Sequence, residues 1–338
     1  MFRNIQEAIA FFDGLKPYLK TRIMGQDHVI EAVSEKLRYW FLSINAPDRP
    51  TTFFFLGPTG TGKTEIVREL INYIYGDPGK LLRIDMSEFG NTAGSDVGRK
   101  LLGQSSGEPG RLYEFLEKYH EGAILYDEFE KANPEIAKYM LQQIDAGRVT
   151  LWNNKTYDIS RFLLFFTSNV GAEIFQGNKH LTMERKVSAA IQRLKDQFGM
   201  PEFIARFGKF NYGIFAFNAL TPEILRQITR KFVEDKLKFL ASIRTRAGNG
   251  FFIPPNFIVT HYSDAVIELA LQQTNTTKNG AREIRDIVDR MLNSVYDRAI
   301  SDNQNANEIV ADLDAVSENG ITRITINTKE TKSEPNHY

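Results

Sequence analysis

The amino-acid sequence predicts an α/β protein in which a five-stranded parallel sheet lies between helices, followed by a smaller and mainly helical domain. Five short apolar runs, rich in β-branched or aromatic residues, predict the strands, and helical patterns separate them. Runs that are apolar on both faces suit a parallel sheet covered by helices on each side. These runs are Phe53–Leu56, Leu81–Ile84, Ala123–Tyr126, Phe162–Phe166 and Ile214–Phe217.

The length of the chain and a change of pattern near residue 218 predict two domains. A chain of 338 residues exceeds the usual size of one domain. Thr221 and Pro222 favour the cap and the first position of a helix, so we place domains at 1–217 and 218–328. An apolar stripe from Ile284 to Tyr296, at intervals of three and four, predicts a long amphipathic helix. Residues 321–326 predict an edge strand, and the polar segment 329–338 is expected to be a disordered tail.

Composition excludes several classes of protein and of site. The 42 basic and 42 acidic residues balance, so no global field favours nucleic acid as a partner. The absence of cysteine excludes disulfides, cysteine-ligated zinc and thiol nucleophiles. The N-terminus lacks the pattern of a signal peptide, and no stretch approaches the roughly 18 apolar residues that span a bilayer. We therefore expect a cytoplasmic protein without a membrane segment.

A phosphate-binding loop follows the first predicted strand. It fits the Walker A pattern in full, between an apolar strand and an amphipathic helix, with the residues Gly57, Pro58, Thr59, Gly60, Thr61, Gly62, Lys63 and Thr64. Glycines allow backbone N–H groups to face phosphate oxygens at the start of a helix. Lys63 would reach the β- and γ-phosphates of ATP, and the hydroxyl of Thr64 would bind Mg²⁺. The sequence therefore predicts a site for ATP and Mg²⁺.

Two acids follow the third predicted strand. The run Ala123–Tyr126 leads directly into Asp127 and Glu128, as in a Walker B segment. Asp127 would hold the water shell of Mg²⁺, and Glu128 would orient and deprotonate the attacking water. Two carboxylates after a strand can instead mark a solvated helix start. The phosphate loop upstream favours the catalytic interpretation.

Seven blocks of residues recur in the order found in a known family. They are Gly25-Gln26-Asp27, Phe55–Gly60, Asp85–Glu88, Asp127–Ala132, Thr167–Gly171, Pro201–Arg206 and Gly280-Ala281-Arg282. In these blocks the chain resembles the Clp-type AAA+ ATPases, especially the second ATPase module of the ClpB disaggregase. The resemblance extends over about residues 23–301. It implies an AAA+ module in which a P-loop nucleotide-binding domain precedes a small helical lid domain.

The resemblance implies catalytic roles for two further residues. Asn169, at the end of the fourth apolar run, matches sensor 1, which positions the lytic water together with Glu128. A turn asparagine is the alternative. Arg206 matches the arginine finger, which would reach the γ-phosphate in the adjoining subunit and neutralise charge in the transition state. The alternative for Arg206 is a surface ion pair that contributes little energy.

Three more residues are implied to contact the nucleotide. Arg282, which opens the long helix of the second domain, matches sensor 2, which would bring that domain onto the nucleotide. Alternatively, Arg282 lies with Arg285 and Arg290 on the solvent-exposed face of an amphipathic helix. Ile23 and Met24 would lie against adenine, although two apolar residues before a glycine are also common in a core.

The segment in which this family carries an aromatic pore loop differs in this chain. Residues 101–112 are shortened and contain no aromatic residue. The segment Gly103–Arg111 offers little apolar contact to an extended polypeptide, so threading of a chain is in doubt. Trp152, at the position of the second pore loop of the family, could compensate. The alternative for Trp152 is a hairpin tryptophan packed on its own domain.

ATP-dependent remodelling of proteins by a ring oligomer, expected to be a hexamer, is the leading hypothesis, because a finger that acts in trans requires a neighbouring subunit. We therefore expect self-association and a protein substrate or partner. The first alternative is a nucleotide-switched scaffold or adaptor in a secretion, mobile-element or defence complex, which the shortened loop favours. A DNA-associated AAA+ regulator is the second, against which the zero net charge counts. No Ile-Gly-Phe or Leu-Gly-Phe tripeptide occurs between Gly171 and Pro201, so docking to a peptidase is not expected.

Overall fold

The chain divides into two compact units, Met1–Ala219 and Leu220–Tyr338, each with its own hydrophobic core. The computed structural model describes residues 4–42, 48–91, 94–103, 109–177, 180–199, 201–243, 255–274, 280–303, 306–318 and 321–332. Within these ranges, no helix combines the length and the apolar character needed to cross a membrane.

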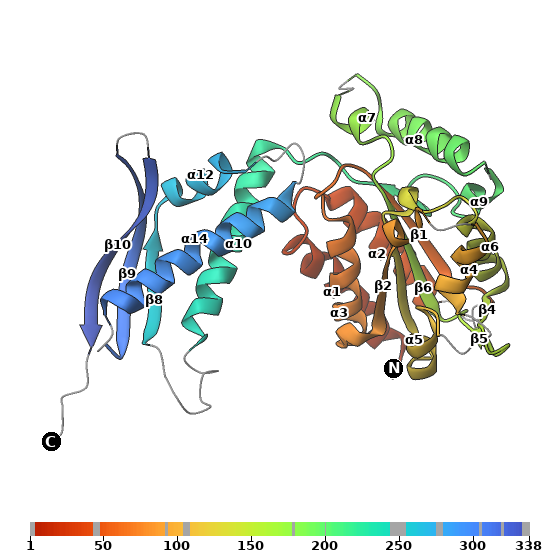
Figure 1. The fold of residues 1–338 in the computed structure, drawn as a ribbon, viewed down its shortest axis with the longest axis horizontal. Helices are drawn as coiled ribbons and strands as arrows, with labels where there is room; N and C mark the ends of the chain where they lie inside the picture. The colour runs from red at the N-terminus through yellow and green to blue at the C-terminus, as the bar shows by residue number, and fades with distance from the viewer. Residues whose placement is uncertain are drawn as a thin grey trace. The chain divides into compact units, whose positions relative to one another are not determined.

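The first unit is built on a five-stranded sheet in the order β2-β3-β6-β1-β7, in which all neighbouring strands are parallel. Figure 1 labels β1, β2 and β6 of this sheet. Each of the five apolar runs forms one strand, so the predicted parallel sheet is confirmed. The strands are β1 (Thr51–Leu56), β2 (Leu81–Asp85), β3 (Gly122–Asp127), β6 (Phe162–Ser168) and β7 (Ile214–Ala216). Since β3, β6 and β1 are adjacent and parallel, their carboxyl ends lie next to one another at one edge of the sheet.

Helices cover both faces of this sheet. Successive residues of a strand point to opposite faces, and the apolar side chains on each face pack against helices. Phe53 and Phe55 of β1 pack in a cluster with α1 (Ile5–Lys20), α2 (Asp27–Phe41) and α3 (Lys63–Tyr75). Phe54 and Leu56 pack in a second cluster with α4 (Gly94–Leu102), α5 (Tyr113–Lys118), α6 (Ile136–Ala146), α7 (Ala172–Gly177), α8 (Met183–Phe198) and α9 (Pro201–Ala205). Each fully buried large apolar side chain contributes about 1.5–3 kcal/mol, so the two clusters hold the strands in place from both sides.

A short hairpin of β4 (Arg148–Thr150) and β5 (Thr156–Asp158) carries Trp152. The indole ring lies 6.0 Å from the ring of Tyr113, and the backbone N–H of Trp152 donates to the carbonyl of Leu102 at 3.0 Å. A Cβ atom added to Gly103 would lie 2.3 Å from Cδ1 of Trp152. Trp152 therefore packs on its own domain, which is the alternative stated for it above.

The second unit contains the predicted long helix and the predicted helix start. It has the helices α10 (Pro222–Ala241), α12 (Asp264–Gln272) and α14 (Ala281–Asp302). The side-chain oxygen of Thr221 accepts a hydrogen bond from the N–H of Ile224 at 3.3 Å, and Pro222 is the first residue of α10. The apolar stripe of α14 is buried against the other elements of this unit.

The sheet of the second unit is larger than the sequence predicts. Strand β8 (Asn256–Tyr262) pairs in parallel with β9 (Glu308–Glu318), and β9 pairs antiparallel with β10 (Ile321–Lys332). The expected edge strand is thus the first half of β10. Residues 329–332, expected to be disordered, continue this strand, and Nζ of Lys329 lies 2.7 Å from a carboxylate oxygen of Asp312. That expectation was wrong because a strand with one solvated face can be largely polar. Residues 333–338 lie outside the described part of the chain.

Candidate active site

The predicted phosphate loop joins the carboxyl end of β1 to the amino end of α3, and its glycines are required by the backbone. Gly57 has φ 143° and Gly62 has φ 102°, in the region that favours glycine. A Cβ atom on Gly57 would lie 2.7 Å from the carbonyl oxygen of Phe217, next to the end of β7. Any larger residue at position 57 would therefore clash with the neighbouring segment.

The side chain of Lys63 is buried against this loop. Its Nζ donates to the carbonyl oxygens of Gly57 at 2.7 Å and Pro58 at 2.6 Å, and to Oδ1 of Asn169 at 2.8 Å. The hydroxyl of Thr61 also donates to the carbonyl of Pro58, at 2.8 Å. These contacts hold a positive charge at the amino end of α3.

The structure brings the hydroxyl of Thr64 and the carboxylate of Asp127 together. Oγ1 of Thr64 lies 3.0 Å from Oδ1 and 3.2 Å from Oδ2 of Asp127. Asp127 is 3% exposed. One hydroxyl and one carboxylate suit Mg²⁺, which uses one or two carboxylates of a protein and completes its shell with water and substrate phosphates. This pair can therefore hold the metal that the sequence predicts.

Glu128 turns toward the site through an unusual backbone conformation. Its φ is 57°, in the left-handed region, which costs about 1–3 kcal/mol for a residue other than glycine. The N–H of Glu128 donates to Oγ1 of Thr167 at 2.9 Å, and the hydroxyl of Thr167 donates to Oδ1 of Asp127. Oε2 of Glu128 lies 2.6 Å from Nζ of Lys131, and this hydrogen bond raises the pKa of Lys131.

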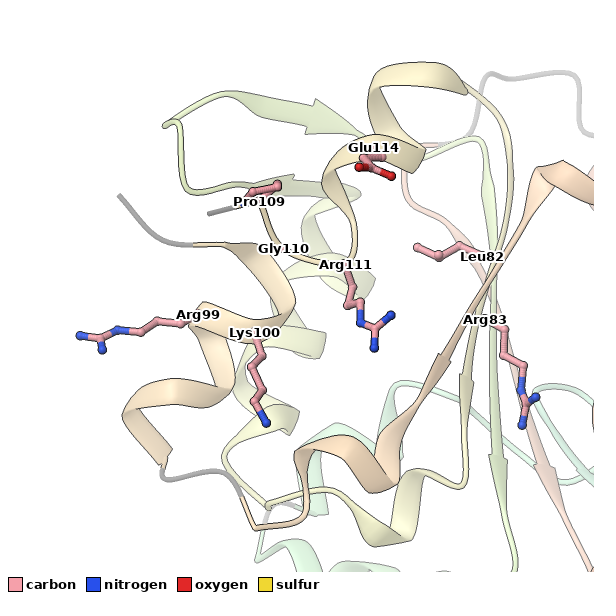
Figure 2. Close-up of a pocket in the computed structure, with 8 residues that line it drawn as sticks. All are labelled: Leu82, Arg83, Arg99, Lys100, Pro109, Gly110, Arg111 and Glu114. Carbon is pink, nitrogen blue, oxygen red and sulfur yellow. The ribbon is translucent and has the colours of Figure 1, made fainter. Parts of the chain in front are cut away.

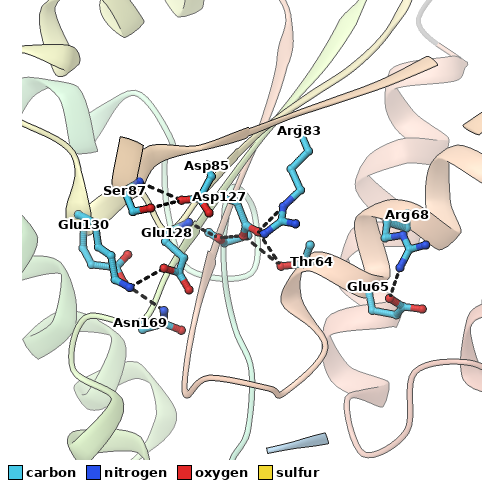
Figure 3. A network of polar contacts seen from close by, with 12 residues as sticks. Thr64, Glu65, Arg68, Arg83, Asp85, Ser87, Asp127, Glu128, Glu130 and Asn169 are labelled. Carbon is cyan, nitrogen blue, oxygen red and sulfur yellow. Dashed lines mark hydrogen bonds and ion pairs between the residues drawn. The ribbon is translucent and has the colours of Figure 1, made fainter. Parts of the chain in front are cut away.

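Asn169 lies between the phosphate loop and the turn that follows β3. Its Oδ1 accepts from Lys63, and its Nδ2 donates to Oε1 of Glu130 at 3.1 Å. Figure 3 shows Asn169 beside Glu130 and Glu128, with Thr64 on the far side of Asp127. The structure thus brings together Lys63, Thr64, Asp127, Glu128 and Asn169, as the sequence predicts for one site.

Three members of this network were missed by the sequence analysis. Thr167 and Glu130 belong to two of the blocks that resemble the family, but the resemblance stated above implies no role for either of them. Arg83 of β2 donates through Nε to Oδ2 of Asp127 at 2.8 Å, and a second nitrogen of its guanidinium lies 2.7 Å from the same oxygen. The order of the strands was needed to see this ion pair, because β2 lies beside β3 only in the folded sheet.

A cavity of about 520 Å³ lies beside β2 and α4 (Figure 2). Its lining includes Arg83, Arg99, Lys100 and Arg111, together with Leu82, Pro109, Gly110 and Glu114. Three of these cations are paired with acids: Arg83 with Asp127, Arg99 with Asp96 at 3.2 Å, and Arg111 with Glu88. Figure 2 shows Arg83 and Arg99 pointing away from each other. The cations therefore do not converge on one anion.

Ile23 lies beside the phosphate loop, and Met24 is half-buried. A Cβ atom on Gly62 would lie 3.5 Å from Cγ2 of Ile23. Gln26 exchanges two hydrogen bonds with the backbone of Asn218, at 3.0 and 2.9 Å, which ties this early block to the end of the sheet. Contact of Ile23 and Met24 with adenine stays a prediction.

Arg206 and Arg282, which the resemblance also implies for the site, follow α9 and open α14, respectively. Arg206 follows α9, and its Nε lies 2.8 Å from a carboxylate oxygen of Asp145 on α6. Arg282 belongs to the second unit, where it is the second residue of α14. The roles that the resemblance implies for Arg206 and Arg282 stay predictions.

Residues 104–108 of the segment Gly103–Arg111, where the family carries its aromatic pore loop, lie outside the described residues. Gly103 and Pro109, on either side of them, form an antiparallel bridge, so the two ends of the segment are held together.

Comparisons with known proteins find relatives of this chain. Residues 48–210 match the family model of the AAA domain (Cdc48 subfamily). The chaperone protein ClpB of Porphyromonas gingivalis is 30% identical over 300 residues, which are 85% of this chain and 32% of that protein. The probable chaperone protein ClpB 1 of Chlorobaculum tepidum is 34% identical over 228 residues, 64% of this chain and 50% of that protein. The chain thus spans about a third to a half of the length of these relatives.

Solved structures of Hsp104 share the fold. The Hsp104-ADP complex of S. cerevisiae has a TM-score of 0.73 and 25% identity, over 92% of this chain and 51% of that one. A closed-state reconstruction of Hsp104 with ATPyS and FITC casein has a TM-score of 0.75 and 23% identity, over 96% of this chain and 53% of that one. Together with the matches over the sequence and the site on the carboxyl edge of the sheet, these similarities identify the chain as a member of the Clp-type AAA+ ATPases.

Proposed function

We propose that the chain binds ATP with Mg²⁺ on residues 57–64 and hydrolyses it as the motor of a protein-remodelling assembly. The main support is two groups of contacts at one edge of the sheet. Lys63 bonds to Asn169, and Asp127 bonds to Thr64 and to Thr167, whose hydroxyl oxygen also accepts from the N–H of Glu128. These residues lie at the carboxyl ends of β1, β3 and β6, the edge at which open α/β sheets bind ligands.

Nucleotide binding is assigned to the loop and to the start of α3. Backbone N–H groups at a helix amino end carry partial positive charge, which suits the triphosphate. Lys63 would exchange its present oxygen partners for the β- and γ-phosphates of ATP. Thr64 and Asp127 would hold Mg²⁺, which when bound neutralises charge on the phosphate oxygens.

Hydrolysis is assigned to Glu128 and Asn169. The backbone of Glu128 is fixed by Thr167, so its carboxylate stays next to the metal ligand Asp127. Glu128 would orient and deprotonate the attacking water, and its contact with Lys131 would hold the carboxylate until water arrives. Asn169 would position the same water by a hydrogen bond from its amide.

A ring, which we expect to be a hexamer, would complete the site. Arg206 has a side chain that is 45% exposed, and Asp145 holds it at the surface. From there it could reach the γ-phosphate of a neighbouring subunit. Arg282 would approach the nucleotide from the second domain, residues 218–328, acting as a lid.

The names of the relatives support a protein as substrate, since two of them are chaperones and one similar Hsp104 structure contains FITC casein. A nucleotide-switched scaffold is the second candidate. It is favoured by the bridge between Gly103 and Pro109, and by the packing of Trp152 on its own domain, which takes that side chain away from any substrate.

Steady-state ATP hydrolysis by the variants Lys63→Ala and Glu128→Gln tests the assignment of the ATPase site. Both should lose at least about 100-fold in rate, the usual contribution of a positioned base or charge. Glu135→Gln is the matched control, because Glu135 makes the same kind of pair three residues along, with Lys138 at 2.5 Å, as Glu128 makes with Lys131. Unchanged turnover in both site variants would overturn the assignment. Loss of fluorescence from a tagged fluorescent protein with ATP supports remodelling, and lasting fluorescence favours the scaffold.

A further inference from the structure

We propose that Glu130 is a positioning residue, whose carboxylate fixes the orientation of the Asn169 amide in the hydrolytic site. The proposal rests on the function proposed above. Glu130 lies in the 3-10 turn η3 (Phe129–Lys131), two residues after Glu128. Its Oε1 accepts the hydrogen bond from Nδ2 of Asn169 at 3.1 Å, although 39 residues separate the two in sequence.

The two partners of Asn169 leave its amide only one orientation. The ammonium of Lys63 is a donor without an acceptor, so it requires the oxygen of the amide to face it. The carboxylate of Glu130 is an acceptor, so it requires the nitrogen. Rotation of the amide by half a turn would place two donors together at Lys63 and two acceptors together at Glu130.

Glu130 becomes the more important partner when ATP is bound. Lys63 is expected to turn to the phosphates, which removes its bond to Oδ1 of Asn169. The carboxylate of Glu130 would then be the remaining restraint on the orientation of the amide. An amide nitrogen has two donors, so one N–H bonds to Glu130 and the second can serve the attacking water.

Stability alone does not explain why an acid occupies position 130. Oε2 of Glu130 is buried and has no hydrogen-bond partner among the residues that the structure describes, and an unpaired buried acceptor destabilises a fold. The backbone of the turn has a separate support, because Nε2 of Gln197 donates to the carbonyl oxygen of Glu130. Replacing the side chain therefore leaves that support in place.

A double-mutant cycle tests the proposal, with kcat for ATP hydrolysis and the Kd for a fluorescent ATP analogue measured for each variant. Glu130→Ala should lower kcat about tenfold and leave Kd within about twofold. Glu130→Gln keeps an acceptor oxygen and should recover most of kcat. Asn169→Ala should lower kcat at least as far, and Glu130→Ala combined with Asn169→Ala should be no slower than Asn169→Ala alone.

The control is Glu135→Ala, which removes an exposed acid from the chain segment after η3 and should leave kcat unchanged. The Tm of each variant is measured beside kcat, so that loss of folding is distinguished from loss of activity. If Glu130→Ala does not fold, Glu130→Met, which keeps the volume of the side chain, takes its place.

Two results would overturn the proposal: kcat of Glu130→Ala equal to that of Glu135→Ala, or losses that multiply in the double variant. Its failure is distinct from failure of the proposed function. If only the role of Glu130 is wrong, Glu128→Gln still abolishes turnover while Glu130→Ala does not. If the proposed function itself is wrong, Lys63→Ala and Glu128→Gln are as active as the natural sequence.

Discussion

The hydroxyl of Thr64 lies 3.0 Å from Oδ1 of Asp127, although 63 residues separate them in sequence. Arg83 from β2 bonds to Oδ2 of the same carboxylate, and Thr167 from β6 donates to Oδ1. Asp127 is therefore contacted from two neighbouring strands and from the start of α3. This arrangement fixes both oxygens of a buried acid at the position where the metal of a phosphate site is expected.

Replacing Asp127 should change the metal dependence of nucleotide binding. Asp127→Asn keeps the shape of the side chain and removes its charge, so the Mg²⁺ concentration needed for half-maximal hydrolysis should rise at least about tenfold. Binding of ATP in EDTA should be nearly unchanged. Asp96→Asn, on an exposed acid that pairs with Arg99, is the control. An unaltered Mg²⁺ titration in Asp127→Asn would contradict the proposed ligand set.

Arg206 should act on the nucleotide of a neighbouring subunit. Arg206→Ala and Lys63→Ala should each be inactive alone, but their mixture should regain activity, because some interfaces then pair an intact finger with an intact loop. Arg193→Ala, which removes another exposed arginine paired with an acid, Glu173, should stay active. No recovery in the mixture would count against catalysis in trans.

Stability should depend on pH through Lys36. Its Nζ donates to the carbonyl oxygen of Thr52 at 2.6 Å, and burial lowers the pKa of Lys36 from 10.5 to about 8. Between about pH 8 and 10.5 the unfolded chain binds a proton that the folded chain has lost, so the free energy of unfolding rises with pH across this window.

Lys36→Met should remove this rise, which amounts to at most about 3 kcal/mol. Chemical unfolding at a series of pH values, compared with Lys138→Met on an exposed side chain, measures the difference. If the free energy of unfolding changes with pH in the same way for the natural sequence and for Lys36→Met, Lys36 does not titrate in this window.

Gly103→Ala should destabilise the first unit by about 1–3 kcal/mol, because position 103 has φ 92° and a new methyl group would meet Trp152 and the backbone of Gly110. Gly76→Ala is the matched control. Gly76 also has a positive φ, 62°, but nothing lies within 4 Å of an added Cβ. Equal losses in the two variants, measured by denaturant unfolding, would mean that the contacts with Trp152 and Gly110 contribute nothing.

Much of the first unit could be predicted because β1, β3, β6 and β7 are buried on both faces along almost their whole length. Such strands are continuous apolar runs, and Phe53 to Leu56 followed by the glycines of the phosphate loop is a pattern with few alternatives. The order of the strands could not be read in this way. The partners that depend on it, Arg83 and Thr167 on Asp127, were therefore missed.

The sheet of the second unit shows the opposite case. Strand β8 carries Thr260, His261 and Tyr262 on a partly solvated surface, so its apolar pattern is weak. The polar end of β10 resembles a tail until it is paired with β9.

Glu130 was missed for another reason, since its acceptor role depends on the orientation of Asn169, a side chain 39 residues away.

Binding of ATP by the purified chain in Mg²⁺, measured by calorimetry beside Lys63→Ala, tests the central claim most directly. The account predicts saturable binding of one nucleotide per chain, and an affinity at least about tenfold weaker in Lys63→Ala, because that variant loses the ammonium that faces the phosphates. No measurable affinity in the natural sequence, or equal affinity in the two proteins, would contradict it.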